Sequence, residues 1–385
     1  MQKWNHDEFC EKREREEAVG QIAAGYDSSA HADSSGPRSA LLPSVDLTYV
    51  EAAVHSIGAV LRRGNLVILE STVPPGTIEN VVIPILERYG WSRNDILLAH
   101  APERVIPGAV MREMVENDRI VGGVTPQAAA AARDLYATFV RGDIVTTDAT
   151  TAEFVKLIEN TYRDVNIALA NELARVAEYL GINVQEAIAL ANRHPRVNLL
   201  KPGPGVGGHC IPVDPYFLIE LAPHLTPLMQ AARAVNNGMV RHVVSTVTRL
   251  AREMNLFRWV VLGAAYKANV ADERNSPSIA ISRLLVEQGV SVVVHDPYIV
   301  RFNRPLEDVV VGADGLLLLT DHSVYRLLDP ASIASRMTKR FLFDTRLCVD
   351  VPKWEEHGFT VWRLGDGRAG NRAPGHRWST SASSV

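Results

Sequence analysis

A glycine-rich loop that ends in a cysteine and a carboxylate is the segment of this sequence best suited to chemistry. The string PGPGVGGHCIPVDP covers Pro202–Pro215 and places Cys210 four residues before Asp214. Glycines let a backbone approach a ligand closely, and a thiol becomes a nucleophile where a base or a cation activates it. A lone cysteine is more often a buried structural residue, but core cysteines lie in apolar, periodic segments and this one does not. We therefore predict that Cys210 is reactive.

The glycines of this loop also invite a second interpretation, as a dinucleotide-binding turn. Such a turn follows a strand and opens a helix. No strand is predicted before Gly203, and we expect Pro212 and Pro215 to prevent a helix after the loop. The context therefore favours a ligand-contacting loop of another kind.

A second set of polar residues lies on a predicted helix. Lys156, Asn160 and Arg163 are spaced i, i+4 and i+7, so they share one stripe of that helix. A lysine and an asparagine one turn apart suit a proton shuttle and an oxyanion donor. The same spacing is equally typical of a solvated helix face, so both interpretations stay open.

Three further polar loops follow predicted strands, at the end where α/β sheets bind ligands. The loops are ESTVPPGT at 70–77, APERVIPG at 101–108 and GAAYKANVADERNSP at 263–277. The second places Glu103 and Arg104 at this edge. The third contains Lys267 and Arg274 and leads into a helix, so it suits a phosphate group unless its cations are ordinary surface charges.

Strands that alternate with helices must position these loops. Short apolar runs at 66–70, 96–99, 120–124 and 144–147 predict one parallel sheet, and runs at 259–263, 290–296, 316–319, 341–344 and 360–364 predict another. Residues 150–180 give the strongest helical signal. Thr150 and Glu153 match a capping box at its start, and Gly181 is a natural stop at its end.

Composition excludes several classes of protein. The 385 residues have a net charge of −4 without a basic block, which disfavours nucleic acid as a partner. The chain contains no apolar run of membrane-spanning length, and its N-terminus is charged, so we expect neither a membrane span nor a signal peptide. Three cysteines fit a reducing cytoplasm, and the 12 histidines show no metal-ligand spacing, so we predict no metal site.

Taken together, these strings resemble the UDP-glucose/GDP-mannose dehydrogenase family. The matching strings are ESTVPPGT, APERVIPG, ENDRIVGG, KLIENTYRDVNIALANE, NRHPRVNLLKPGPGVGGHCIPVDP, AYKANVADERNSP and HDPY. They occur in the family's order between about Val45 and Leu364. ENDRIVGG and GGHCIPVD resemble most the branch that oxidises UDP-N-acetyl-D-mannosamine.

The resemblance implies a fold of two Rossmann-like domains joined by a long central helix and a helical dimerisation region. It divides the chain into an atypical, poorly ordered segment (1–44), an incomplete NAD-binding domain (45–149), a central domain (150–255), a UDP-sugar-binding domain (256–365) and a disordered tail (366–385). The helix at 150–180 is then expected to form a homodimer.

The resemblance also implies the reaction, a two-step NAD-dependent oxidation of the sugar's C6 alcohol to a carboxylate. Cys210 would capture the intermediate aldehyde as a thiohemiacetal and then carry a thioester. Lys156, Asn160, Asp214 and an ordered water would share the proton and oxyanion roles, and Glu103 would assist thioester hydrolysis.

The family pattern assigns the remaining contacts residue by residue. Thr72 and Arg274 correspond to positions that contact NAD. His194 and Arg196 would reach the substrate of the neighbouring subunit. The substrate contacts within one subunit would be Arg104, Val105, Lys156, Asn160, Arg163, Gly207, Tyr266, Lys267 and Arg346.

One departure concerns the cofactor. The family opens with a strand, a G-x-G-x-x-G turn and a helix that bind the NAD pyrophosphate. The glycines before Gly64 are Gly20, Gly25, Gly36 and Gly58, and none of them forms G-x-G. We therefore expect the first half of the NAD-binding domain to be missing. Three interpretations follow: a working dehydrogenase, an inactive relative that binds nucleotide sugar and dimerises, or a fragment with an artefactual N-terminus.

Overall fold

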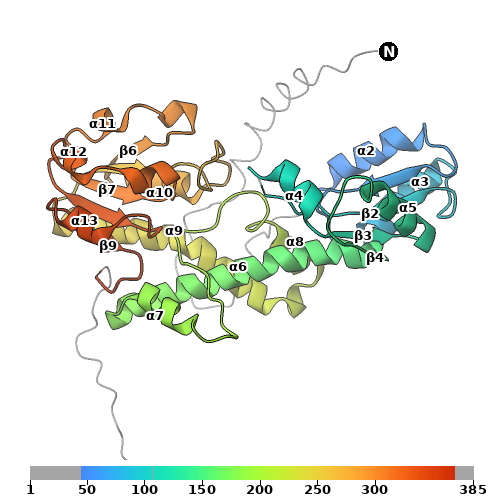
Figure 1. The fold of residues 1–385 in the computed structure, drawn as a ribbon, viewed down its shortest axis with the longest axis horizontal. Coiled ribbons are helices and arrows are strands. Elements are labelled where there is room, and N and C mark those ends of the chain that lie inside the picture. Colours follow the sequence, from blue (N-terminus) through green and yellow to red (C-terminus); the bar gives the residue numbers. More distant parts are fainter. Residues whose placement is uncertain (1–44, 107, 369–385) are drawn as a thin grey trace, which may run out of the picture. The chain divides into compact units, whose positions relative to one another are not determined.

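Two short-stranded β-sheets are separated in the sequence by long helices, and the helices hold most of the residues in regular structure. A computed structural model describes residues 45–106 and 108–368. The order of elements is α/β, helical, α/β (Figure 1), which confirms the predicted fold class. The predictions for residues 1–44 and for 369–385 fall outside the described residues.

The first sheet is mixed, so the prediction of a parallel sheet is wrong at one pairing. Its order is β1 (Leu66–Leu69), β2 (Leu97–His100), β3 (Arg119–Gly123) and β4 (Ile144–Asp148). The outer pairs are parallel, but β2 and β3 are antiparallel. A parallel pair needs a crossover that packs on the sheet. The connection here contains α4 (Val110–Glu116), which buries none of its residues, and the chain returns in the opposite direction.

Helices cover this sheet through two apolar clusters. The covering helices are α2 (Thr48–Gly58), the π-helix η1 (Ile78–Val82), α3 (Ile83–Arg88) and α5 (Pro126–Tyr136). Ile78 and Leu98 belong to one cluster, and Val121 and Ala132 belong to the other. Among the described residues β1 pairs on one side, with β2, and all four of its residues are half-buried, as expected for an edge strand.

The long central helix α6 (Ala149–Leu180) follows β4 directly (Figure 1). The predicted capping box is wrong: Asp148 is the N-cap, and its carboxylate accepts from the backbone N–H of Thr151. The carboxylate of Glu153 instead faces the loop after β1, where it accepts from the backbone N–H groups of Gly76 and Ile78. The predicted stop is confirmed, because Gly181 adopts the left-handed conformation with a φ of 71°. α7 (Val184–Ala191), α8 (Asp214–Leu221), η2 (Pro223–Leu225) and α9 (Pro227–Glu253) follow.

A buried polar network joins α6 to α9. The carboxylate of Asp164 accepts from Arg233 Nη1 at 2.6 Å and from Asn236 Nδ2 at 2.7 Å. Asn171 Nδ2 in turn donates to Asn236 Oδ1 at 2.9 Å. All four side chains are buried. These hydrogen bonds accompany the buried ion pair and link α6 to α9 at fixed positions along both helices.

The second sheet is parallel throughout. Its order is β6 (Ser291–His295), β5 (Arg258–Leu262), β7 (Gly315–Leu318), β8 (Phe341–Asp344) and β9 (Thr360–Arg363). β6 lies on one side of β5, whereas β7 and the later strands lie on its other side. In α/β sheets such a switch point forms a ligand crevice at the carboxyl ends of the strands. The associated helices are α10 (Pro277–Glu287), η3 (Val300–Phe302), α11 (Leu306–Val309), η4 (Ser323–Leu327), α12 (Pro330–Ala334) and α13 (Val351–Glu355).

Alternate residues of its strands fill two cores. Trp259 and Val261 face the cluster that α9 and α10 complete, whereas Val260 and Leu262 face the cluster around Tyr325 and Trp354. This follows from the two-residue period of a strand. A sheet buried on both faces explains why these strands read as continuous apolar runs.

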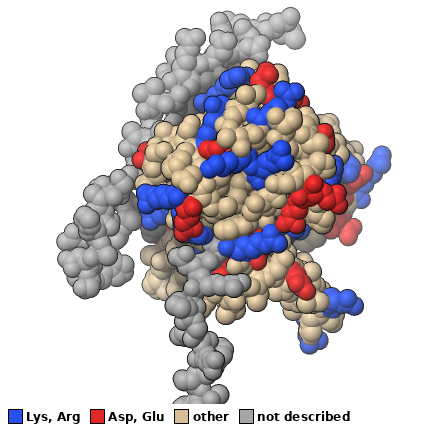
Figure 2. All heavy atoms as spheres, turned by 90° about the vertical axis from the view of Figure 1, so that its left-hand side faces the viewer, with Lys and Arg blue, Asp and Glu red and all other residues tan. Residues whose placement is uncertain are grey.

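In the face shown in Figure 2, basic and acidic side chains are interspersed, without a large patch of one sign. Within the described ranges, every helix is too short or too polar to cross a lipid bilayer.

Candidate active site

The glycine-rich loop is pressed against the loop that follows β5. Gly208 has a φ of 90°, and a Cβ there would lie 2.7 Å from the ring of Tyr266. A Cβ on Gly207 would lie 2.7 Å from the backbone oxygen of Asn275. The loop's start is fixed as well, because Gly203 N donates to Asn171 Oδ1 at 2.8 Å, from the α6–α9 network. Glycine is therefore required where two chain segments meet.

Cys210 lies in the turn that opens α8. Its carbonyl accepts from the backbone N–H groups of Val213 and Asp214, at 3.1 and 2.8 Å. The expectation that prolines prevent a helix here is wrong, because Pro215 occupies the first turn of α8, where a missing N–H is harmless. Cys210 is an exposed free cysteine, in agreement with the prediction that it is not a core residue. Cys348, in contrast, is buried.

α6 supplies a polar stripe to this turn. Asn160 is only 6% exposed, and its Nδ2 donates to Asp214 Oδ2 at 2.6 Å. The solvated-face interpretation is therefore wrong for Asn160. Lys156 and Arg163, from the same stripe, both act electrostatically on the thiol of Cys210.

The charges of this group shift two pKa values. Burial raises the pKa of Asp214 to about 6, against the opposing effects of the Asn160 hydrogen bond and the Lys156 charge. Desolvation raises the pKa of the Cys210 thiol, and the carboxylate of Asp214 raises it further, while Lys156 and Arg163 lower it. A carboxyl group that titrates near neutrality beside a protonated thiol can act as a proton acceptor for it.

The loop after β2 adds Glu103 to the same group. Glu103 raises the pKa of the Cys210 thiol through its charge, and it accepts from the backbone N–H of Val105. Arg104 is held differently, by Glu159 of α6, with Arg104 Nη2 2.6 Å from Glu159 Oε1. It also donates to the backbone oxygen of Asp118 at 3.0 Å.

The loop after β1 is fixed by a residue whose role the sequence patterns did not reveal. Glu153 is 1% exposed, and it accepts from the backbone N–H groups of Gly76 and Ile78, the latter at 2.9 Å. Burial raises its pKa. Because its partners are more than 70 residues away, its capping-box spacing was misleading. Thr72 lies half-buried in the loop that Glu153 anchors.

A second network missed by the sequence patterns holds the loop after β5. Asp296 accepts from the backbone of Ala264 and Ala265 at 2.7 and 2.9 Å and faces His322 Nε2 at 2.9 Å. The N–H of Asn269 donates to His322 Nδ1 at 2.8 Å. Although burial opposes it, these hydrogen bonds lower the pKa of Asp296 to about 2. The DP of the HDPY string was the available signal.

This loop contributes several of the predicted residues. Tyr266 N donates to Asp272 O at 3.0 Å, and its phenol is within electrostatic reach of Cys210. Lys267 is half-buried next to it. Arg274 forms an ion pair with Asp272 and, like it, acts on His209, the neighbour of Cys210.

Of the remaining predicted site residues, one lies against the glycine-rich loop and two do not. Arg346 pairs with Asp321 at 3.0 Å, and its guanidinium lies close enough to Gly203 to clash with a Cβ there. His194 and Arg196 lie in the exposed loop after α7, where Arg196 N donates to His194 Nδ1 at 3.3 Å. No described interaction joins either of them to Cys210 or its neighbours.

The donor set fits one part of the expected cofactor. The loops after β1 and β2 lie at one edge of the first sheet, with Thr72 and Glu103 on them, and Arg274 provides a cation near His209. A hydroxyl such as that of Thr72 suits the ribose and carboxamide groups of NAD, and a guanidinium suits its diphosphate. For metals, residues 45–368 contain no cluster of three potential ligands.

Comparisons with known proteins find similarity to one family over most of the chain. Three sequence models of the UDP-glucose/GDP-mannose dehydrogenase family match: its NAD binding domain at residues 34–140, its central domain at 150–238 and its UDP binding domain at 260–351. The UDP-N-acetyl-D-mannosamine dehydrogenase of Methanocaldococcus jannaschii is 45% identical over 329 residues, which is 84% of this chain and 75% of the relative.

Two further similarities complete the comparison. The NDP-N-acetyl-D-galactosaminuronic acid dehydrogenase of Ralstonia solanacearum is 46% identical over 318 residues, covering 78% of this chain and 74% of that protein. The solved structure of UDP-D-ManNAc dehydrogenase from Pyrococcus horikoshii superposes with a TM-score of 0.79 at 43% identity, covering 84% of this chain and 78% of that one.

Proposed function

The chain belongs to the UDP-glucose/GDP-mannose dehydrogenase family, and on that premise we propose that it oxidises C6 of UDP-N-acetyl-D-mannosamine to the uronate through a covalent intermediate on Cys210. The family makes it an NAD-dependent nucleotide-sugar dehydrogenase. The names of the relatives at 45% and 46% identity both refer to N-acetylhexosamine derivatives, which favours this class of sugar as the substrate.

One observation carries the proposal: an exposed thiol lies beside a buried carboxyl group of pKa about 6. The Asp214 carboxylate is ionised at neutral pH, whereas the Cys210 thiol, with its raised pKa, keeps its proton. Asp214 is thus suited to accept the thiol proton when the sulfur attacks. Lys156 acts on both groups and suits the transfer of the C6 hydroxyl proton.

Each bond change of the proposed oxidation can be assigned to a residue near Cys210. Bound NAD+ supplies the hydride acceptor in both oxidations. When the sulfur of Cys210 adds to the C6 aldehyde, an S–C bond forms and the carbonyl oxygen gains negative charge. Asn160 uses one of its two N–H donors on Asp214 and has the other for this oxyanion.

Oxidation of the thiohemiacetal then leaves a thioester. Water attacks its carbonyl carbon, the S–C bond breaks, and the products are the uronate and the free thiol. Glu103, whose charge reaches Cys210, is placed to take a proton from that water.

The substrate's diphosphate and sugar would contact the residues that border this group. Arg104, Val105, Arg163, Gly207, Tyr266, Lys267 and Arg346 form this set. Thr72 and Arg274 would contact NAD. A Cβ on Gly207 would lie 2.9 Å from the Cβ of Tyr266, so these two proposed contacts are neighbours.

We further propose a homodimer through α6. Ile158, Tyr162, Leu169 and Val176 are 46%, 59%, 45% and 48% exposed, at steps of four and seven residues. These steps place them on one face of the helix. A second copy covering that face would shield apolar surface, and His194 and Arg196 would then serve the partner's substrate.

A second candidate function is nucleotide-sugar binding without turnover. The observation that favours it is the match of residues 260–351 to the family's UDP binding domain, which is separate in the sequence from the match to the NAD binding domain. This candidate predicts UDP-sugar binding that NAD does not affect.

The deciding experiment measures NADH formation by absorbance with UDP-N-acetyl-D-mannosamine and NAD+. We expect two NADH per sugar in the wild-type protein and none in Cys210→Ser. Cys348→Ser is the matched control and should keep its activity. Intact UDP-sugar binding without NADH would refute the proposal in favour of the second candidate, and full activity in Cys210→Ser would refute the role of the thiol.

A further inference from the structure

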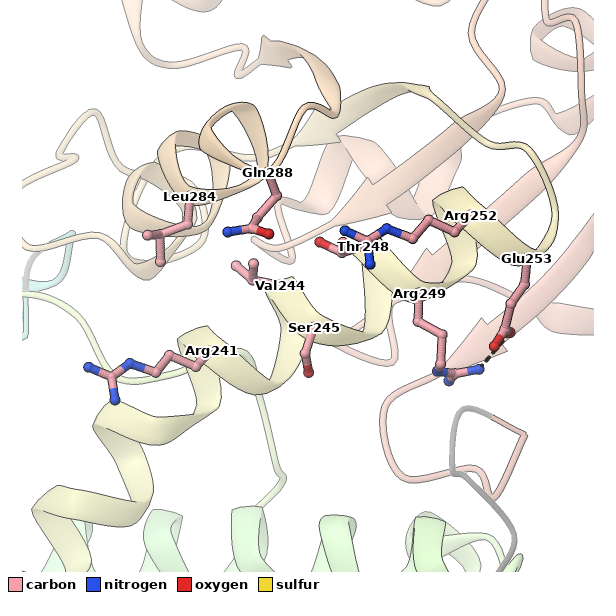
Figure 3. Close-up of a pocket in the computed structure, with 9 residues that line it drawn as sticks. All are labelled: Arg241, Val244, Ser245, Thr248, Arg249, Arg252, Glu253, Leu284 and Gln288. Carbon is pink, nitrogen blue, oxygen red and sulfur yellow. Dashed lines mark hydrogen bonds and ion pairs between the residues drawn. The ribbon is translucent and has the colours of Figure 1, made fainter. Parts of the chain in front are cut away.

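A pocket separate from Cys210, Asp214 and the residues around them lies between α9 and α10 (Figure 3). It has a volume of about 630 Å³, within the range of sites that bind small organic ligands. Its polar lining consists mainly of Arg241, Ser245, Thr248, Arg249, Arg252 and Gln288. None of these residues belongs to the proposed catalytic or substrate set.

The lining is organised by helical spacing. Arg241, Ser245, Thr248 and Arg252 are spaced i, i+4, i+7 and i+11, so they form one stripe along α9. Gln288, just after the end of α10, lies opposite (Figure 3). The two helices pack against each other, so these positions are fixed by the fold.

The charge of the pocket is positive. Three arginines line it against one acidic residue, Glu253, which forms an ion pair with Arg249 at 3.0 Å. Arg252 extends back along α9 toward Thr248 in Figure 3, away from that ion pair. A guanidinium presents several N–H donors in one plane, which suits a phosphate group.

An unsatisfied hydroxyl points to the same ligand. Thr248 is 9% exposed, and its Oγ1 has no hydrogen-bond partner within the described part of the chain. A buried polar atom without a partner is uncommon and destabilising. Because Thr248 lines the pocket beside Arg252, a bound anion with oxygen acceptors would satisfy it.

We propose that this pocket binds a phosphorylated small molecule, with its phosphate between Arg252, Thr248 and Gln288. Val244 and Leu284 provide an apolar wall for the organic part. The pocket is large for inorganic phosphate alone, so the ligand class is a phosphate monoester such as a sugar phosphate. The site does not depend on the proposed reaction.

The test measures binding of glucose 6-phosphate to the full chain by isothermal titration calorimetry, with glucose and inorganic phosphate as comparison ligands. We expect the ester to bind more tightly than inorganic phosphate and glucose not to bind. Thr248→Val and Arg252→Ala should each weaken the affinity about tenfold, as the loss of a hydrogen bond to a charged group predicts. Arg283→Ala, on the exposed face of α10, is the matched control and should bind like the wild type.

Thr248→Val also separates ligand binding from folding. Valine keeps the shape and removes an unsatisfied hydroxyl, so the variant without ligand should melt no lower than the wild type. The glucose 6-phosphate-induced rise in melting temperature should shrink in this variant. Absence of binding, equal affinity for ester and inorganic phosphate, or unchanged affinity in both variants would each overturn the proposal. Because no readout uses NADH, a failure here is distinct from a failure of the proposed reaction.

Discussion

Replacing Asp214 by asparagine should stabilise the fold while it removes activity. Burial raises the pKa of this carboxyl group from 3.8 to about 6, so ionisation of the group opposes folding. A shift of about two units corresponds to about 3 kcal/mol at 1.36 kcal/mol per unit. Asparagine does not ionise, and its side-chain oxygen can still accept the hydrogen bond from Asn160.

The pH dependence of this effect has a definite sign. A group whose pKa is raised by folding contributes stability that is complete below its unfolded pKa and is lost as the pH rises through its folded pKa. The wild type should therefore lose stability between about pH 4 and pH 6 through Asp214, and Asp214→Asn should not. The gap in unfolding free energy should approach about 3 kcal/mol above pH 7 and vanish near pH 4.

Urea unfolding at pH 4, 6 and 8 measures this gap, and NADH formation measures activity in the same samples. We expect the rate to fall by about 10²-fold or more, as for the loss of a general base. Asp148→Asn is the control, because hydrogen bonds from Thr151 lower the pKa of Asp148, and the variant should not be stabilised at pH 8. An Asp214→Asn variant with no gain at pH 8, or with an equal gain at pH 4, would contradict the reasoning.

Three further changes test the elements that position the site. Glu153→Ala should lower the unfolding free energy by about 1–3 kcal/mol, because it leaves the buried backbone N–H groups of Gly76 and Ile78 without an acceptor; unchanged urea unfolding would be inconsistent with this role. Gly208→Ala should reduce activity and leave the far-UV circular dichroism unchanged, because its Cβ would meet the ring of Tyr266 at 2.7 Å; a fully active variant would show that the loop tolerates displacement. Asn171→Ala should free the backbone N–H of Gly203, with faster hydrogen exchange at that amide; equal exchange would disprove the tether.

Local sequence signals predicted the elements well where the chain's own periodicity determines them. The central helix ends at Gly181 because glycine adopts the left-handed conformation at no steric cost, and that stop was readable from the sequence. The strands of the second sheet were readable because both faces are buried. The positions of the polar loops at 70–77, 101–108 and 263–277 followed from the ends of strands in both sheets.

Features that depend on distant partners were not readable. The antiparallel pairing of β2 with β3 depends on how α4 packs, and a sequence of alternating elements does not specify it. Glu153 matched a capping box locally but binds residues more than 70 positions away. The pair of Asp296 and His322 arises because the sheet brings two loops together. The helix that begins at Asp214 is not readable from its prolines, because proline breaks a helix interior but is accepted in the first turn, where Pro215 lies.

The direction of the Cys210 pKa shift constrains the mechanism. Lys156 and Arg163 lower the pKa of the thiol, yet desolvation and the Asp214 charge outweigh them. A stored thiolate is therefore not the resting form, and the proposed capture of an aldehyde by Cys210 would require that the proton leave as the S–C bond forms. Asp214 combines the required properties, since it is ionised at neutral pH and has a pKa near 6. Protonating it also removes the negative charge that opposes the thiolate, so a single proton transfer changes both groups in the favourable direction.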